Sequence, residues 1–459
     1  MTILKEIINK NNKKKLFIFP NKKYLSYKQF YNQVLNFAKN YESRLIKTKN
    51  KIVFLRMDRS IDFYIAVIGL AFLKAIIIPI SNKLSKSEIL AFRKMYQPDL
   101  EISSISLTKK NIKNLKIDKD FLKKAKIVFF TSGTTDDPKG VLHNFHNLFK
   151  SSNEFANLAG YKNNDIIIHN WSQYHMAGFF NMFLCPFVKG SSIFFDNEIG
   201  VDSYLGYWDI LKKNKITLSY LSPTMAQALI SFSNYKNEKL NLTKTKFFST
   251  GSFLYKSTAS RFKREFDVDL IDCYGVTEVG GSFAISSKSS LEDKLSKISK
   301  GIKIKLSKNN EICIKSKFMF EGYLEKYSKV KKYKQSYFRS GDLGKIQKGK
   351  YSITGRLKEI IKKGGEPVSL LHIEDITLKH KGVKDVLAKG VTSEFWGEDI
   401  ELDVIFSVSP DKMNQDNKIN FLKRYLGQNL PRIQMPRKIN SVTSIPKTSI
   451  GKNYRRYFN

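Results

Sequence analysis

Cysteine is scarce in this sequence, and so is negative charge. The three cysteines, Cys185, Cys273 and Cys313, are odd in number and far apart, with no CxxC pair among 459 residues. This pattern excludes a disulfide-stapled module and disfavours a structural zinc site, so we expect a reducing compartment, the cytoplasm. The N-terminal residues carry lysines but no apolar stretch followed by a small-residue cleavage site, and we expect no secretion signal.

Long apolar runs are also lacking, with one exception at residues 63–80 (FYIAVIGLAFLKAIIIPI). A membrane-spanning helix here would place Lys74 inside the bilayer at a cost of about 2.5–3.5 kcal/mol. The run also changes from a helical composition to the β-branched IIIPI. We therefore predict a buried helix followed by a buried strand, and no transmembrane segment.

Acidic residues number 41 against 80 lysines and arginines, which gives a net charge of +39. Lysine, asparagine, isoleucine, tyrosine and phenylalanine share codons rich in A and T, so drift in base composition accounts for the charge without a binding function. The lysines are spread over the whole chain and form no basic face with interleaved aromatic residues. We predict no specific nucleic-acid binding, and only weak association with polyanions or an anionic membrane surface at low salt.

The length predicts two or three compact units. From about residue 24 to 240, helical stretches alternate with short apolar runs rich in β-branched residues. These runs are IVFLRM at 52, IIIPI at 76, KIVFFT at 126, SIFF at 192 and ITLSYL at 216. Strands separated by helices predict an α/β fold with a parallel-rich sheet flanked by helices and a site at the carboxyl ends of the strands.

Short strands and turns dominate residues 302–355, in segments such as IKIKL, EICIKS and YSITG, and predict a β-rich subdomain. A stretch rich in lysine and glycine, LKEIIKKGGEPVS, follows Arg356 and marks a domain boundary. The last hundred residues have patterns sufficient for a small α+β domain.

The segment TSGTTDDPKG, residues 131–140, follows the apolar run KIVFF directly. Its hydroxyls, backbone N–H groups and lysine form a loop suited to surround a polyphosphate. It is not the nucleotide-kinase type of loop, in which Gly-Lys precedes Ser or Thr. A flexible polar turn is the alternative, which the strand context and the Pro-Lys-Gly ending disfavour. The candidate phosphate-binding residues are Thr131, Ser132, Gly133, Thr134, Thr135 and Lys139.

This loop resembles the signature of the adenylate-forming superfamily, usually written TSGTTGxPKG. That superfamily includes acyl-CoA synthetases, aryl-acid ligases, peptide-synthetase adenylation domains and luciferases. Asp136 stands where the family usually has glycine, and a carboxylate near a triphosphate is unfavourable unless magnesium or lysine offsets it. Further segments match family motifs in the same order over nearly the whole chain.

YGVTE at 274–278 is similar to the adenine and magnesium segment of the family. The resemblance implies that Tyr274 packs on the adenine, that Thr277 contacts the α-phosphate and that Glu278 holds Mg2+ as a hard oxygen ligand.

Two other segments resemble nucleotide-binding motifs of the family. Gly251 and Ser252 stand in the place of the glycine-rich loop at the adenine edge, although Ser252 and Phe253 replace its usual Ala-Pro. FRSGDLG at 338–344 resembles the segment whose aspartate, here Asp342, accepts both ribose hydroxyls.

The C-terminal third resembles the hinge and the cap of the family. GRLKEIIKKGGEPVS implies Arg356 near the ribose, Lys358 as the pivot and Gly365 near an incoming pantetheine arm. PKTSIGKNYRR implies that Lys452 bridges the substrate carboxylate and the leaving phosphate. After the glycine loop, Leu370 and His372 replace the usual proline and first glutamate of the family.

The resemblance implies an N-terminal adenylation domain over residues 1–355, a hinge over 356–358 and a small mobile α+β cap over 359–459. His175, in NWSQYHMAGFF, matches the aromatic-His-x-x-Gly segment that lines the acyl pocket, although a satisfied core histidine is the alternative. The candidate acyl-pocket residues are mostly apolar or small: Phe179, Met182, Pro223, Thr224, Met225, Gly280, Gly281 and Ser282.

The implied activity is activation of a fatty, branched or aromatic acid by ATP and Mg2+, followed by thioester formation with CoA. Residues 174–182 carry no aspartate to bind an ammonium group, so we expect a substrate without an α-amino group. Two alternatives remain: transfer to the phosphopantetheine of an acyl carrier protein, and a non-catalytic nucleotide-binding homologue. The oligomeric state is open.

Overall fold

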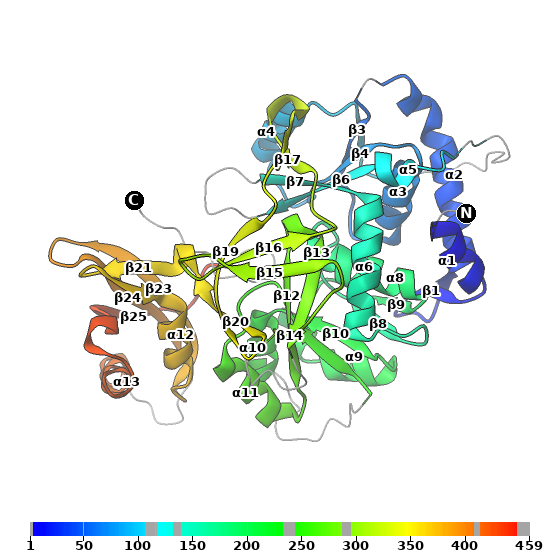
Figure 1. Ribbon diagram of the computed structural model, residues 1–459. Helices are drawn as coiled ribbons and strands as arrows, with labels where there is room; N and C mark the ends of the chain where they lie inside the picture. Colours follow the sequence, from blue (N-terminus) through cyan, green and yellow to red (C-terminus); the bar gives the residue numbers. More distant parts are fainter. Residues whose placement is uncertain are drawn as a thin grey trace.

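The computed structural model of the protein describes residues 3–48, 50–105, 115, 117–131, 139–199, 201–232, 244–286, 295–407 and 414–447. Helices pack on both faces of extended sheets, and a smaller unit formed by the C-terminal residues lies at one side (Figure 1). The predicted α/β class is confirmed.

A seven-stranded sheet, counted over the described residues, contains the first predicted strands in the order β18-β17-β7-β6-β4-β3-β5. Among β3, β4, β5 and β6, neighbouring strands are parallel. Strands β6 and β7 form an antiparallel pair, which places Thr131 opposite Lys139. The strands are β3 (Ile52–Leu55), β4 (Ile76–Pro79), β5 (Leu100–Ile102), β6 (Lys126–Thr131), β7 (Lys139–Asn144), β17 (Gly322–Leu324) and β18 (Val330–Lys332).

The apolar run at 63–80 forms the helix and strand predicted for it. Helix α3 (Ile61–Phe72) is buried over most of its length and leads into β4. Lys74 joins them in the left-handed conformation, with φ at 62°. The N–H of Ala75 donates to the carbonyl of Leu70 at 3.1 Å, which ends the helix in a Schellman turn. No helix in the described ranges is long and apolar enough to cross a membrane.

A second sheet has thirteen strands among the described residues, in the order β15-β16-β19-β20-β14-β13-β12-β11-β10-β8-β9-β1-β2. Its middle strands, from β1 to β12, are parallel, and the strands beyond β12 are antiparallel. The first part contains β1 (Lys15–Ile18), β2 (Tyr24–Ser26), β8 (Ile166–His169), β9 (Ser192–Phe195), β10 (Leu218–Leu221), β11 (Lys246–Ser249) and β12 (Leu270–Val276).

Most of the β-rich segment predicted at 302–355 continues this sheet, whereas its strands β17 and β18 belong to the seven-stranded sheet. The hydrogen-bonded ladder of the large sheet runs on from β12 without a break. The strands are β13 (Gly281–Ser286), β14 (Leu295–Ile298), β15 (Ile302–Leu306), β16 (Glu311–Ser316), β19 (Phe338–Gln347) and β20 (Lys350–Arg356).

The main hydrophobic core lies between the two sheets and takes in side chains from both of them. A second cluster covers the other face of the large sheet. Helices on the first side are α1 (Ile3–Asn11), α2 (Tyr27–Ile46), α3, α5 (Phe121–Lys124), α6 (Phe145–Ala159), α7 (Met176–Phe179) and α8 (Cys185–Lys189). Helices on the second are α9 (Tyr207–Lys213), α10 (Pro223–Phe232) and α11 (Lys256–Phe266), while α4 (Lys86–Tyr96) packs on the seven-stranded sheet.

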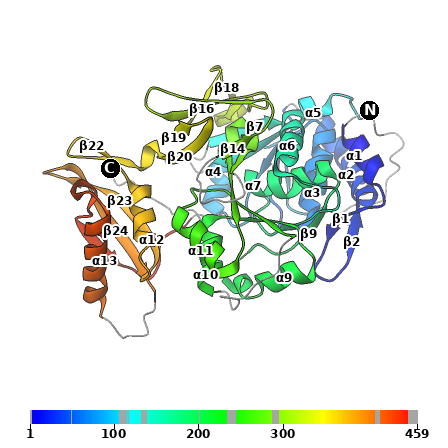
Figure 2. The same ribbon diagram turned by 60° about the horizontal axis from the view of Figure 1, so that its bottom comes forward.

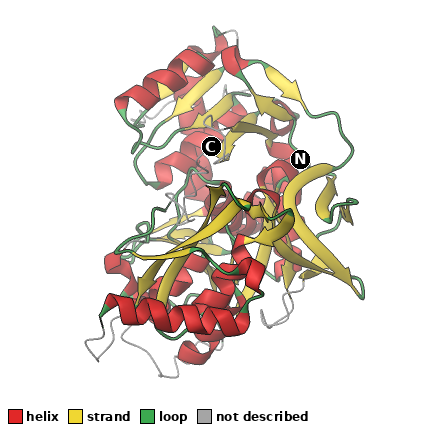
Figure 3. Cartoon of the chain, turned by 90° about the vertical axis from the view of Figure 1, so that its left-hand side faces the viewer, coloured by secondary structure: helices red, strands yellow, loops and turns green. Residues whose placement is uncertain are grey.

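The C-terminal unit has a hydrophobic core of its own, formed by side chains between Ile361 and Ile439. Figure 3 views the molecule from the side of this unit. Its elements are β21 (Ile360–Lys363), β22 (Glu366–Ser369), α12 (Leu370–Leu378), β23 (Val383–Ser393), β24 (Gly397–Phe406), α13 (Gln415–Asn429) and β25 (Lys438–Ser441).

The C-terminal unit docks through α12 against the beginning of α11 (Figure 2). The hydroxyl of Tyr255 donates a hydrogen bond to the fully buried carboxylate of Glu374, whose other oxygen accepts from the N–H of Ala388 at 2.7 Å. The Ser257 hydroxyl donates to Asp375 at 2.8 Å.

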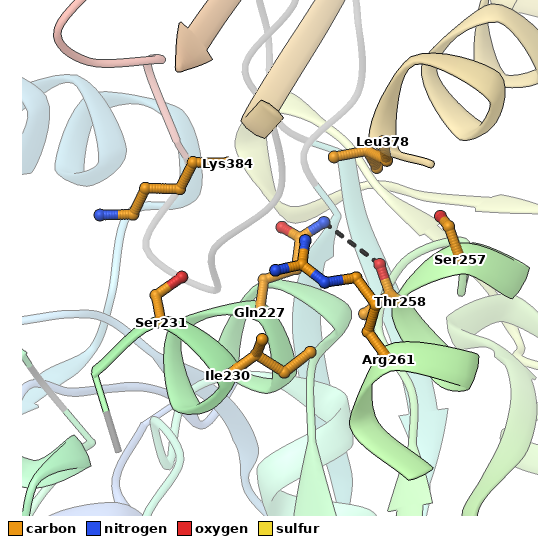
Figure 4. Close-up of a pocket in the computed structure, with 8 residues that line it drawn as sticks. All are labelled: Gln227, Ile230, Ser231, Ser257, Thr258, Arg261, Leu378 and Lys384. Carbon is orange, nitrogen blue, oxygen red and sulfur yellow. Dashed lines mark hydrogen bonds between the residues drawn. The ribbon is translucent and has the colours of Figure 1, made fainter. Parts of the chain in front are cut away.

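A crevice with room for at most about one water molecule lies beside these contacts (Figure 4). Its walls include Thr258 and Arg261 of α11 and Lys384 of β23, and Gln227 donates a hydrogen bond to Thr258 across its floor at 3.2 Å. The interface is therefore closely packed and polar.

Replacing Lys74 with glycine should stabilise the protein by about 1 kcal/mol, because a left-handed conformation costs a residue with a Cβ roughly that much. The lost ion pair with Asp118, at 3.5 Å and about one-third exposed, offsets little of this. The same change at Lys150, in the interior of α6, should instead destabilise by about 1 kcal/mol. Denaturant titration measures the free energy of unfolding of both variants. A destabilised Lys74→Gly variant would contradict the left-handed conformation of residue 74.

Candidate active site

The buried carboxylate of one predicted nucleotide-binding residue, Asp342, contacts two others. Asp342, 4% exposed on β19, accepts a hydrogen bond from the hydroxyl of Tyr274 at 2.7 Å and one from Nε of Arg356 at 2.6 Å. Tyr274 lies on β12 and Arg356 ends β20, so the contact ties together strands far apart in the sequence. A carboxylate has about four acceptor sites, so Asp342 keeps capacity for the hydroxyls of a ribose.

A second buried carboxylate lies in the 3-10 turn after β12. Burial raises the pKa of Glu278, while its hydrogen bond from Tyr323 and the charges of Lys139 and Arg356 act in the opposite direction. The Tyr323 hydroxyl donates to Oε1 of Glu278 at 3.1 Å, and Lys139 Nζ lies 5.7 Å from the centre of the Tyr323 ring. Glu278 is thus brought together with the lysine that ends the phosphate loop.

The main chain of Thr277 is held by a histidine to which the sequence assigned no role. His143, on β7, is fully buried, and its Nε2 lies 2.7 Å from the Thr277 carbonyl. Because a carbonyl only accepts, the proton must reside on Nε2. Burial lowers the pKa of His143 to about 4, so the ring is neutral at pH 7.

The segment around His175 forms a tight turn against the large sheet. His175 is the N-cap residue of α7, and its carbonyl accepts from the N–H of Phe179 at 3.0 Å. A Cβ on Gly178 would lie 2.3 Å from the Ser172 carbonyl oxygen, so the glycine of this segment is required by the close approach of two backbones.

The acyl-pocket candidates divide into three groups. Phe179 and Met182 are fully buried in the main hydrophobic core, where Phe179 packs on Phe129 and Phe183. Thr224 and Met225, in α10, are partly exposed. Gly280, Gly281 and Ser282 are buried directly after Glu278, and Pro223 is buried at the start of α10.

The structure does not bring every predicted residue into this cluster. Gly365 lies with Gly364 in the exposed two-residue turn of the β21–β22 hairpin, where φ values of 57° and 83° favour glycine. Lys358 is exposed in the 3-10 turn Leu357–Glu359. Gly251 and Ser252 form the half-buried loop after β11. Ser132, Gly133, Thr134, Thr135 and Lys452 lie outside the described residues.

Residues 119–324 match the AMP-binding enzyme family, and residues 372–452 match the AMP-binding enzyme C-terminal domain. The chain belongs to the AMP-binding enzyme family. The prediction of an adenylate-forming enzyme of the acyl-CoA synthetase or aryl-acid ligase type is confirmed.

Relatives of this AMP-binding enzyme include acid–CoA ligases. A 2-succinylbenzoate–CoA ligase of Staphylococcus epidermidis is 26% identical over 342 residues, which are 72% of this chain and 68% of that protein. An oxalate–CoA ligase of Saccharomyces cerevisiae is 25% identical over 358 residues, which are 72% of this chain and 62% of that protein.

Two solved structures show the same fold. An anthranilate–CoA ligase in complex with anthranoyl-AMP has a TM-score of 0.84 at 18% identity, covering 98% of this chain and 94% of that one. ATP-bound MatB from Rhodopseudomonas palustris has a TM-score of 0.83 at 17% identity, covering 98% and 97%. A large N-terminal part with a smaller C-terminal part is therefore the architecture of this AMP-binding enzyme.

The donor set around Glu278 fits magnesium better than a softer metal. The described residues contain no group of three His, Cys, Asp or Glu side chains that would enclose a metal ion. Mg2+ is commonly held by one or two carboxylates together with substrate phosphates and water, which is what a single buried carboxylate beside a phosphate loop offers. Oε1 of Glu278 is oriented by Tyr323.

Tyr323 and His143 are therefore functional candidates that the sequence reasoning missed. Neither belongs to a motif that it used, and each meets its partner only because β7 and β17 pair beside the end of β12. A weak signal for Tyr323 was available, since a tyrosine follows glycine at the start of a short β-rich run.

Replacing Tyr323 with phenylalanine should raise the Mg2+ concentration for half-maximal pyrophosphate release roughly 10-fold, because hydrogen bonds to charged groups contribute about 1.5–3 kcal/mol. Mn2+ affinity of the ATP complex, followed by electron paramagnetic resonance, should weaken in parallel. Tyr333→Phe is the control, because its ring also packs on Phe320 while its hydroxyl donates to the Tyr337 carbonyl. Equal Mn2+ affinity in the Tyr323→Phe variant and the parent would exclude the orienting role.

His143 should make folding stability depend on pH. Its pKa is about 4 in the folded chain against an ordinary 6.5, so the unfolded chain binds more protons between these values and stability falls as the pH drops. Through this group alone, the free energy of unfolding at pH 5 should be about 2 kcal/mol below that at pH 7. Denaturant titrations should show this pH dependence shrink in His143→Gln but not in His372→Gln, which alters an exposed histidine.

Proposed function

We propose that this chain activates a carboxylic acid with ATP and Mg2+, forming an acyl-adenylate and pyrophosphate, and then transfers the acyl group to the thiol of CoA. The observation that carries the proposal is the cluster in which Asp342 joins Tyr274 to Arg356 beside the buried carboxylate of Glu278. Relatives named as acid–CoA ligases support CoA as the acceptor of the acyl group.

The first half-reaction brings a carboxylate against the α-phosphate, so negative charge builds up between two anions. Catalysis then needs cations more than a base, because a carboxylic acid is already ionised near neutral pH. In this proposal Thr277 and Lys452 would contact the α-phosphate, and Lys139 with Thr131 and the loop that follows it would hold the departing pyrophosphate. Glu278 would hold Mg2+, which would supply charge neutralisation at this point.

Tyr274, Gly251 and Ser252 hold the adenine, and Asp342 and Arg356 hold the ribose. His175 would act as the gate of the acyl pocket near the substrate carboxylate. Burial of Asp342 strengthens its hydrogen bonds to the nucleotide, because the interior screens them less than water does.

The division into an N-terminal domain over 1–355, a hinge over 356–358 and a cap over 359–459 follows the same proposal. Rotation about Lys358 would withdraw Lys452 and bring Gly365 toward the thiol. The separate hydrophobic core of the C-terminal unit supports a cap that turns as one body. Three buried free cysteines are compatible with a reducing compartment, the cytoplasm.

The first test measures pyrophosphate released from ATP and Mg2+ with a panel of fatty, branched, aryl and dicarboxylic acids, with and without CoA. Release that depends on one of the acids is expected, with formation of the acyl-CoA thioester. Release without a thioester would favour a carrier-protein acceptor, and silence over the whole panel would favour a non-catalytic homologue.

Lys452→Ala should abolish adenylate formation, because the developing charge then lacks its cation. The same variant should still convert a supplied acyl-adenylate to the thioester at close to the parent rate. Asp342→Ala is the contrasting variant, since loss of the ribose contact should weaken both half-reactions. Equal loss of both half-reactions in Lys452→Ala would exclude a mechanism in which the C-terminal cap takes one orientation for each half-reaction.

A further inference from the structure

One arginine joins the two sheets at the carboxyl ends of their strands. Arg59 lies in the short segment between β3 and α3 and is partly buried. Its Nε donates to the carbonyl of Asp196, directly after β9, at 2.7 Å. Its Nη1 donates to the Trp171 carbonyl at 2.6 Å, and its Nη2 to the carbonyl of His169, the last residue of β8, at 2.5 Å. The guanidinium therefore holds three main-chain carbonyls of the large sheet and its loops.

No carboxylate among the described residues accepts a hydrogen bond from Arg59. The remaining contacts of its guanidinium are with Nδ1 of His169, at 3.3 Å, and with the ring of Phe195, 4.3 Å away. Burial lowers the pKa of Arg59, because a cation is held partly out of water. A planar guanidinium has five N–H groups in a fixed fork, so it can hold three carbonyls at once. The contacts of Arg59 fix main-chain positions and do not form an ion pair.

The loop that Arg59 holds, residues 170–175, ends at His175, the N-cap residue of α7. The side chain of Gln173 donates back to two main-chain carbonyls in the segment before Arg59, at 3.3 and 3.2 Å. The hydroxyl of Tyr174 also donates to a carbonyl of that segment. The loop and the segment after β3 are thus joined in both directions.

The same loop borders the nucleotide side of the site. Trp171 comes within 3.5 Å of the position that a Cβ on Gly251 would take. Its Nε1 donates to the Tyr220 carbonyl at 3.0 Å, which anchors the indole independently of Arg59. Loss of the arginine would therefore release the His175 end of the loop more than the Trp171 end.

We propose that Arg59 is a positioning residue for the acid: it fixes the loop that places His175 at the acyl pocket. The inference rests on the proposed function and deepens it, because it gives the placement of the acid to a side chain outside the family motifs. In the described part of the chain, the cluster of Asp342 and Arg356 shares no hydrogen bond with Arg59. Nucleotide binding should therefore not depend on this arginine.

The test measures acid-dependent pyrophosphate release with the acid that the parent enzyme prefers. Arg59→Ala should lower kcat/KM for this acid about 10- to 100-fold, because a small displacement of a positioning group is costly. The rise in Tm that ATP and Mg2+ produce should remain, because nucleotide binding is retained. Arg44→Ala is the control: this exposed arginine also lies over an aromatic ring, that of Tyr41 at 5.2 Å, near the end of α2. It should leave both measurements unchanged.

Free guanidinium ion gives a second readout. Added to Arg59→Ala well below the concentrations that unfold the protein, it should restore part of kcat/KM for the acid, because it can donate to the same carbonyls. Sodium chloride at equal ionic strength should not. Arg59→Lys keeps the charge and the aliphatic part but lacks the fork, so its kcat/KM for the acid should also be low. This variant replaces Arg59→Ala if the alanine variant does not fold.

A parent-like kcat/KM for the acid in either folded variant would overturn the inference while leaving adenylation intact. Loss of the ATP effect on Tm together with the activity, or failure of both variants to fold, would assign Arg59 to the stability of the whole domain and would also overturn it. Silence of the parent with every acid would instead remove the proposed function and this inference with it.

Discussion

The arrangement of the site depends on the need of one buried carboxylate for partners. Asp342 is removed from water, and an unpaired charge there would be strongly destabilising. Its partners come from β12 and from the last residue of β20, so satisfying Asp342 fixes the antiparallel extension of the large sheet against its parallel part. Glu278 follows β12 directly, and its position beside Lys139 is a consequence of the same alignment.

The local patterns of the sequence were sufficient to predict individual helices and strands. The strands near residues 52, 76, 126, 192 and 216 and the helix and strand within 63–80 were predicted from composition and periodicity. The joining of the β-rich segment to the large sheet was not predicted, because strand partners depend on contacts between residues distant in the chain. Domain boundaries and the roles of individual site residues remain predictions.

The dependence on contacts between distant residues also explains which site residues could be predicted from the sequence. Tyr274, Glu278 and Asp342 stand in recognisable segments, so a single sequence was sufficient to select them. His143 and Tyr323 act through one hydrogen bond each to a residue of another strand, and such a bond leaves no local pattern. Phe179 and Met182 were selected as pocket candidates but lie in the main hydrophobic core. Apolar residues suit a pocket and a core equally, so the sequence could not distinguish the two.

The contact between Tyr255 and Glu374 has a thermodynamic consequence for any turning of the C-terminal unit. The Glu374 carboxylate is closed off from solvent while the two units are docked, and separation would let water replace the tyrosine hydroxyl. Hydration of the separated surfaces would then be part of the equilibrium between orientations. Excluded osmolytes, which oppose the exposure of new surface, would shift that equilibrium toward the docked state without touching the nucleotide.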